Sequence, residues 1–292
     1  MGDTEVVQTI FGPMEAFAGE CVTRDLRRFG AYQRSDLAML LSLVRPGDYV
    51  LDVGAHIGTF AVPLATAVGP QGHLVAFEPV PETAAVLARN LPPNASIERV
   101  VIGAQSGTAA APLLAKKLGQ TSFEVAADNG RFPVETLDHW WVTHHKPLVA
   151  VIKMDVQGME LAALGGAAHV LEDCRPVVQF EVDLTQRNLD RGTLRVLGQF
   201  FEVRGYRCYI NQLPREAASD RFRLGHLRSV ASLALSYWGI FDVVAVPRGS
   251  SRLVVPSTPR WVTTSYLLAR GARAHGDRLH QRLFGRSFDP NG

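Results

Sequence analysis

Short apolar runs alternate with helical patterns along most of this chain, and the alternation limits the folds that it can adopt. Strands are expected at residues 49–53, 74–77, 97–102, 148–155, 177–182, 206–210 and 241–246. Helical patterns are found at residues 35–44, 57–68, 82–91, 159–171 and 193–203. Strands that are joined through helices form parallel sheets with helices on both faces. The sequence therefore predicts an α/β fold around a mostly parallel sheet.

The order of the elements also divides the chain into regions. Residues 1–47 are expected to form an N-terminal helical cap, and residues 48–248 the α/β domain. Residues 212–240, between the last two strands, greatly exceed the ~2–5 residues of a plain hairpin connection. We therefore expect this segment to be a lid-like insertion at the active site. Residues 249–292 form a C-terminal tail.

The charge distribution bears on the partners of the protein. The whole chain has a net charge of +2, and the tail contains seven Arg and two Asp. The remaining residues, 1–248, therefore carry a net charge of −3. A nucleic-acid binder usually shows a strongly basic face, so nucleic acid is not expected as a partner. Because the tail interleaves Arg with large apolar residues, it could lie on an anionic membrane or a partner. Docking on its own domain is the favoured alternative.

Compartment and metal content follow from what the sequence lacks. It has no N-terminal secretory pattern and no run of ~20 apolar residues that could span a membrane. We therefore expect a cytoplasmic protein. Cys21, Cys174 and Cys208 are widely spaced and lack metal-ligand spacing, which predicts free thiols and no metal site. Nothing in the sequence indicates an oligomeric state.

The most specific local pattern is VLDVGAHIGTF at Val50–Phe60, a buried strand that runs into a glycine-containing turn. Glycines allow a ligand to approach the backbone closely. The turn lacks the G-x-G-x-x-G pattern that places a pyrophosphate at a helix N-terminus. It therefore favours a ligand with cationic groups and no phosphates, although a purely structural turn is the alternative. The candidate binding residues are Asp52, Gly54, Ala55, His56 and Gly58.

An acid at the end of the second strand forms the next candidate. Glu78 lies twenty positions after Gly58 and is followed by Pro79. At this place in nucleoside-binding α/β folds an acid accepts hydrogen bonds from ribose hydroxyls. We expect Glu78 and Pro79 to line the site, the alternative being a solvated Glu before a helix. His56 could touch the ligand or cap the following helix.

A third cluster lies in VIKMDVQGMELAALGGA at Val151–Ala167. Lys153 and Asp155 are two apart on a strand and therefore share a face. Such an ionised pair inside a parallel sheet is costly unless it is mutually satisfied or functional. Asp155 and Glu181 both fall at carboxyl ends of strands, where open α/β sheets bind ligands. The alternatives are a structural ion pair for Asp155 and an inert rim position for Glu181.

These motifs resemble the FkbM family of S-adenosylmethionine-dependent methyltransferases over roughly Asp25–Val246. The resemblance is carried by RFGAYQ, DVGAHIG, FEP, VETLD, KMDVQGME and RPVVQFEV. Family members generally read K-x-D-x-E-G-x-E in the fifth of these motifs, and Gln157 here replaces the first Glu. The other four positions of this pattern match, at Lys153, Asp155, Gly158 and Glu160.

The resemblance implies a Rossmann-like sheet of seven strands, with an antiparallel last strand and helices on both faces. It implies S-adenosylmethionine as cofactor and O-methylation of a hydroxyl on a sugar, glycan or polyketide-type small molecule. Asp155 or Glu181 would accept the hydroxyl proton, and Lys153 would tune the charge of that acid.

Two other functions are weighed against this one. A non-catalytic S-adenosylmethionine-binding partner protein is suggested by Gln157, which cannot take a proton. A nicotinamide-dependent Rossmann oxidoreductase or epimerase is disfavoured, because the chain lacks both the triple-glycine turn and a Tyr-x-x-x-Lys dyad.

Overall fold

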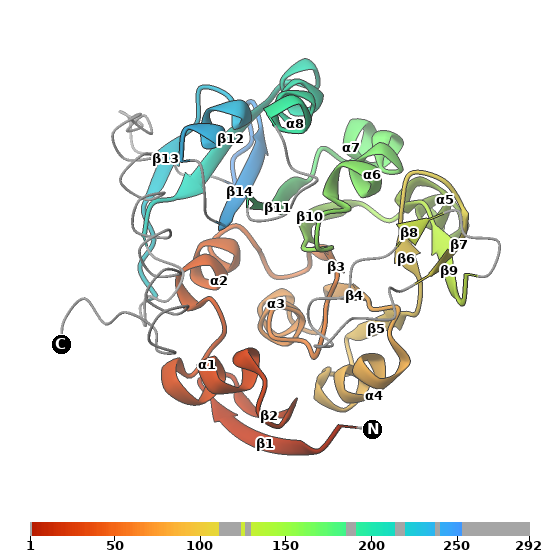
Figure 1. The fold of residues 1–292 in the computed structure, drawn as a ribbon, viewed down its shortest axis with the longest axis vertical. Coiled ribbons are helices and arrows are strands. Elements are labelled where there is room, and N and C mark those ends of the chain that lie inside the picture. The colour runs from red at the N-terminus through yellow and green to blue at the C-terminus, as the bar shows by residue number, and fades with distance from the viewer. Residues whose placement is uncertain are drawn as a thin grey trace, which may run out of the picture.

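The computed structural model describes residues 2–110, 124–125, 130–184, 191–213, 220–236 and 240–252 of the 292-residue chain. The tail from residue 253, together with Tyr237 and Trp238 of the predicted lid, lies outside this range. Within the described residues, the largest sheet has eight strands in the order β13-β12-β14-β11-β10-β3-β4-β5 (Figure 1). None of the described helices is long and apolar enough to cross a bilayer.

The main sheet confirms the expected mostly parallel arrangement. Its strands are β3 (Tyr49–Val53), β4 (His73–Phe77), β5 (Ala95–Glu98), β10 (Val149–Met154), β11 (Val177–Asp183), β12 (Tyr206–Asn211), β13 (Leu224–His226) and β14 (Ile240–Pro247). The five neighbouring strands β5, β4, β3, β10 and β11 run parallel to one another. Strand β14 lies between β11 and β12 and is antiparallel to both. The antiparallel last strand of the expected seven is therefore β14. The short strand β13 adds an eighth at the edge.

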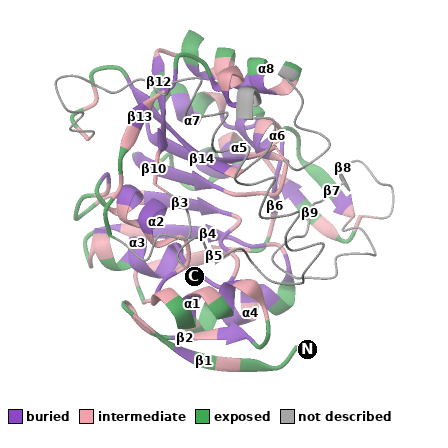
Figure 2. Ribbon diagram, turned by 60° about the vertical axis from the view of Figure 1, so that its left-hand side comes forward, coloured by how far each residue is buried: buried purple, intermediate pink, exposed green. Residues whose placement is uncertain are grey.

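Helices cover both faces of this sheet, as expected. On one face lie α2 (Arg34–Leu41), α3 (Ala61–Val68) and α4 (Pro81–Asn90), and on the other α5 (Leu137–Thr143), α6 (Glu160–Gly165), α7 (Ala168–Asp173) and α8 (Arg191–Val203). Adjacent strand residues point to opposite faces, so Val50 packs with the first set and Leu51 with the second. Figure 2 shows the result: the central strands are buried, and exposed residues lie on the helices and connecting segments. The central strands are therefore mostly apolar, and their buried polar residues are Asp52, Lys153, Gln179 and Glu181.

Two predicted elements are each divided in two. The strand expected at residues 97–102 ends at Glu98, and β6 (Val101–Ile102) instead joins a smaller sheet. This sheet has the order β6-β9-β7-β8 and includes β7 (Gly107–Ala110), β8 (Glu124–Val125) and β9 (Phe132–Glu135). The helix expected at residues 159–171 breaks between α6 and α7, where Gly166 packs so closely that an added Cβ would lie 2.2 Å from the Gly103 carbonyl oxygen.

The described part of the 212–240 insertion extends the sheet. It contains β13, which pairs with β12, and the 3-10 helix η2 (Val230–Ser236), which packs on α8. Leu227, Val230 and Leu233 are buried in the core on the α8 side. None of the described insertion residues lines the cavity described below.

The N-terminal segment is not purely helical. A hairpin of β1 (Thr4–Thr9) and β2 (Gly12–Phe17) precedes α1 (Cys21–Phe29). The hairpin packs beside α4 (Figure 1). The Asn90 side chain accepts a hydrogen bond from the Glu15 amide at 2.8 Å. Its Nδ2 donates to the carbonyl oxygens of Glu15, at 2.9 Å, and Ile57, at 2.8 Å. Asn90 therefore joins the hairpin to the glycine-containing turn after β3.

A buried polar network joins α2 to the end of β12. Asn211 Nδ2 donates to Ser35 Oγ at 2.6 Å and to Asp36 Oδ1 at 3.1 Å. Its Oδ1 accepts from the backbone amides of Leu213, at 3.1 Å, and Arg223, at 3.0 Å. The network therefore connects the N-terminal segment, the sheet and the insertion.

We predict that Asn211→Leu lowers the free energy of unfolding by about 1–3 kcal/mol or more, because buried donors and acceptors lose their partner. Urea unfolding followed by circular dichroism would measure this. Gln199→Leu, at an exposed amide on α8, is the control and should change stability by less than about 0.5 kcal/mol. Equal urea midpoints for the two variants would contradict the prediction.

Candidate active site at the carboxyl edge of the sheet

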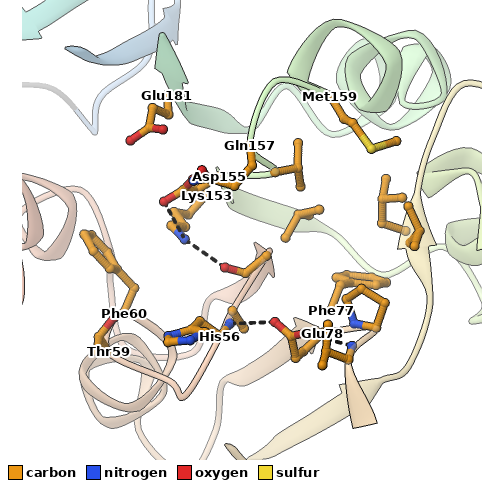
Figure 3. A pocket seen from close by; sticks show the side chains of 18 of the residues that line it. His56, Thr59, Phe60, Phe77, Glu78, Lys153, Asp155, Gln157, Met159 and Glu181 are labelled. Atoms are coloured by element: carbon orange, nitrogen blue, oxygen red, sulfur yellow. Dashed lines mark hydrogen bonds and ion pairs between the residues drawn. The ribbon is translucent and has the colours of Figure 1, made fainter. Parts of the chain in front are cut away.

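A cavity lies at the carboxyl ends of β3, β4, β10 and β11. After β3 the chain continues to β4 on one side, and after β10 it continues to β11 on the opposite side. Open α/β sheets bind ligands at the carboxyl ends of strands where the strand order reverses in this way. Eight of the ten predicted site residues line the cavity (Figure 3). These are Gly54, Ala55, His56, Glu78, Pro79, Lys153, Asp155 and Glu181. Asp52 and Gly58 do not line it.

The two glycines of the turn serve the packing of the chain itself. A Cβ on Gly54 would lie 1.9 Å from the Asp155 carbonyl oxygen, and one on Gly58 would lie 2.9 Å from Leu87 Cδ1. Both residues also have positive φ, +82° and +96°, which glycine adopts without strain. Segments of this chain therefore approach both glycines closely, and Gly54 in addition lines the cavity.

Glu78 is buried and held by the turn. Its Oε2 accepts from the His56 amide at 3.0 Å, and its Oε1 accepts from the Val80 amide at 2.9 Å. Burial raises the pKa of Glu78 to about 7, although these two amide hydrogen bonds act in the opposite direction. Glu78 is therefore not a solvated residue, and its carboxyl group changes charge near neutral pH.

His56 occupies a left-handed position within the turn, with φ of 51°. Helix α3 begins at Ala61 after Phe60, so His56 does not cap it. The imidazole Nε2 lies 3.8 Å from Glu20 Oε2. Burial lowers the pKa of His56 to about 4, so the ring is neutral at pH 7.

Lys153 connects the two strands at the centre of the site. Its ammonium lies 3.2 Å from Asp52 Oδ1 and 3.9 Å from Asp155 Oδ2, and it donates to the Gly54 carbonyl oxygen at 3.2 Å. Burial opposes the charged form of Lys153, but Asp52 and Asp155 outweigh this effect and raise its pKa. The expected pair with Asp155 is therefore a three-membered cluster in which Asp52, fully buried, is the nearer acid.

The loop after β10 carries Asp155 and two residues with positive φ, Gln157 at 53° and Gly158 at 96°. Gln157 Nε2 donates to Asp155 Oδ1 at 2.8 Å. Glu160 Oε1 accepts from the amides of Val156, at 3.1 Å, and Gly158, at 3.2 Å. Glu160 therefore stabilises this loop and does not line the cavity.

Other cavity residues were not found from the sequence. An apolar wall is formed by Phe77, Val80, Val100, Val101 and Ile102. Val22 and Tyr32 reach the cavity from the N-terminal segment, and Thr59 and Phe60 from the turn after β3. In the sequence these residues resemble ordinary core positions, and only tertiary packing brings them together. Among the described residues, no three His, Cys, Asp or Glu side chains gather as a metal site.

We predict that Gly54→Ala destabilises the protein by about 3 kcal/mol or more, because its Cβ would overlap backbone and the left-handed φ would be strained. Thermal and urea unfolding would measure the loss. Gly12→Ala is a matched control, since Gly12 also has positive φ but a Cβ there would meet nothing within 4 Å. The prediction is wrong if the two variants are equally stable.

Several solved structures are similar to this chain at low sequence identity. The methyltransferase FkbM of Methylobacillus flagellatus KT is 14% identical, with a TM-score of 0.44, over 70% of this chain and 47% of that chain. A Thermotoga maritima SAM-dependent O-methyltransferase is 17% identical, with a TM-score of 0.40, over 85% and 79%. A putative rRNA-methylase from Clostridium thermocellum is 10% identical, with a TM-score of 0.43, over 75% and 98%. The chain thus spans about half the length of the Methylobacillus protein.

Sequence comparison is more specific than these structural likenesses. No curated protein matches the chain. A family model described as the methyltransferase FkbM domain matches residues 52–208, from β3 to β12 and across every motif of the cavity edge. Because this match covers more than half of the chain, the protein belongs to the FkbM methyltransferase family.

Proposed function

We propose that this protein transfers the methyl group of S-adenosylmethionine to a hydroxyl of a sugar, glycan or polyketide-type small molecule. The observation that carries the proposal is that Lys153, Asp155 and Glu181 line the same cavity as the apolar wall described above. A nucleoside-containing cofactor suits the apolar side. An acceptor that must lose a proton suits the carboxylates.

The residues present fit this cofactor. Each oxygen of Glu78 accepts one backbone hydrogen bond and keeps a further lone pair for a ribose hydroxyl. The apolar wall of Val80, Val101 and Ile102 would contact the adenine ring. His56 also lines the cavity, and its neutral imidazole lies beside Glu20. The part of the cofactor that neither Glu78 nor the apolar wall contacts would lie against Gly54, Ala55 and Pro79.

The cofactor supplies an electrophilic methyl group, and the protein must align the acceptor oxygen and remove its proton. Asp155 or Glu181 would accept this proton. Lys153 is held protonated by Asp52 and Asp155, so it would act through its charge and not as a base. Val22 and Tyr32 would help to exclude water from the transfer.

Partners and location follow as further parts of the proposal. Residues 1–248 carry a net charge of −3, which supports a small-molecule or glycan acceptor over nucleic acid. We infer a cytoplasmic protein whose basic tail can make peripheral contacts.

Incubation with methyl-labelled S-adenosylmethionine and pools of sugars, glycans and hydroxylated polyketides would test the activity. Cofactor binding without transfer to any pool would favour the non-catalytic alternative that Gln157 suggests.

We predict that Asp155→Asn lowers the turnover number by about 10²–10⁴-fold, the usual result of losing a general base. Stability should change little, because Lys153 keeps its nearer partner Asp52 at 3.2 Å. Single-turnover methylation and thermal unfolding of the same variant would measure both effects. A loss of about 3–5 kcal/mol in stability would instead indicate a structural ion pair, and normal turnover would exclude the catalytic role.

We predict that S-adenosylhomocysteine binds more tightly as the pH rises through 7. The pKa of Glu78 is about 7, and only its ionised form can accept from both ribose hydroxyls, so affinity should rise about tenfold between pH 6 and pH 8. Calorimetry should show that Glu78→Gln weakens binding by about 1–3 kcal/mol and flattens the pH dependence. Glu82→Gln, at an exposed site on α4, is the control. A pH dependence that survives in Glu78→Gln would contradict the assignment.

A further inference from the structure

We propose that Gln157 is a positioning residue that fixes the carboxylate of Asp155 at the methyl-transfer end of the cavity. The inference rests on the proposed function, because it assumes that the cavity binds S-adenosylmethionine. It concerns the one position at which this chain departs from the usual K-x-D-x-E-G-x-E pattern.

The contacts hold the Asp155 carboxylate by both oxygens. Gln157 Nε2 donates to Oδ1 at 2.8 Å, and the Lys153 ammonium lies 3.9 Å from Oδ2. Figure 3 shows these three side chains together on one side of the cavity, below Glu181. The hydrogen bond from Gln157 restricts rotation of this carboxylate, and the longer ion pair with Lys153 favours the same orientation. Its direction is therefore set before any ligand enters.

The backbone aims the Gln157 side chain. Gln157 has a φ of 53°, a left-handed conformation that residues with a Cβ adopt rarely and that persists only where surrounding contacts enforce it. The amides on both sides of Gln157 donate to one oxygen of Glu160. On the other side, Gly54 allows the Asp155 carbonyl oxygen to approach the turn after β3. The loop is therefore held at both of its ends, as a positioning role requires.

An amide at this position has a different effect from an acid. Gln157 offers Asp155 a hydrogen-bond donor at every pH. A Glu at the same place would put two carboxylates within hydrogen-bond distance, and such pairs share one proton. The glutamine therefore leaves Asp155 as an acceptor, facing the cavity beside the Lys153 charge.

The test uses two cofactor analogues and needs no acceptor. S-Adenosylhomocysteine has a neutral sulfur at the transfer position, whereas sinefungin has a carbon that bears a protonated amine there. The ratio of their dissociation constants therefore reports on a correctly placed negative charge at this position. Calorimetry on the full chain would give this ratio for the wild type and for each variant, between pH 6 and pH 8.

We expect the wild type to prefer sinefungin, and Gln157→Leu to reduce that preference at least fivefold. Gln157→Gly should reduce it similarly while unfolding at the same or a higher temperature, because glycine removes the donor and relieves the left-handed strain. Gln157→Glu should make the preference rise with pH. In an Asp155→Asn background, Gln157→Leu should have no further effect, since the two residues act as a unit.

A residue with only a structural role in the loop would alter the melting temperature and leave the analogue ratio unchanged. An unchanged ratio in both Gln157→Leu and Gln157→Gly, with S-adenosylhomocysteine still bound, would overturn the inference. Gln157→Gly keeps the test decisive if Gln157→Leu does not fold. Failure of the wild type to bind either analogue would instead refute the proposed function on which the inference rests.

Discussion

The site depends on the position of one buried ammonium group, that of Lys153. It pairs with Asp52 on the neighbouring strand, with Asp155 beyond the end of its own strand, and with the Gly54 carbonyl oxygen. Removing a charge from water is costly unless such partners surround it. Because those partners come from β3, the turn after it and the loop after β10, Lys153 fixes these three segments relative to one another. The edge between β3 and β10 is thereby set in a single geometry.

The two loops that meet at this edge are held in similar ways. Each contains a residue with a Cβ in the left-handed region, His56 at φ 51° and Gln157 at φ 53°. Each is also held by a buried acid that accepts backbone amides, Glu78 in one case and Glu160 in the other. Strained conformations persist where surrounding contacts over-determine them and are frequent at functional sites. The arrangement therefore favours a rigid, preformed binding edge.

The sequence predicted those features that local patterns determine. Strand β3 was expected at Tyr49–Val53 and is observed there, because an apolar run between turn residues defines it. The division between β5 and β6 was missed, since β6 pairs with β9 and only tertiary pairing decides this. The strand period correctly placed Lys153 beside Asp155. It could not show that the parallel register sets Lys153 opposite Asp52, which is why the nearer ion pair was not foreseen.

The charges around the cavity also bear on the order of events under the proposed function. Of the described residues that line it, Lys153 is the one basic residue besides neutral His56, whereas Glu78, Asp155 and Glu181 are acids. A surplus of acids attracts a sulfonium in the cofactor and opposes an anionic acceptor. Methyl transfer would leave a neutral sulfur, and this attraction would then end. The same charges that favour cofactor binding would therefore favour release of the product.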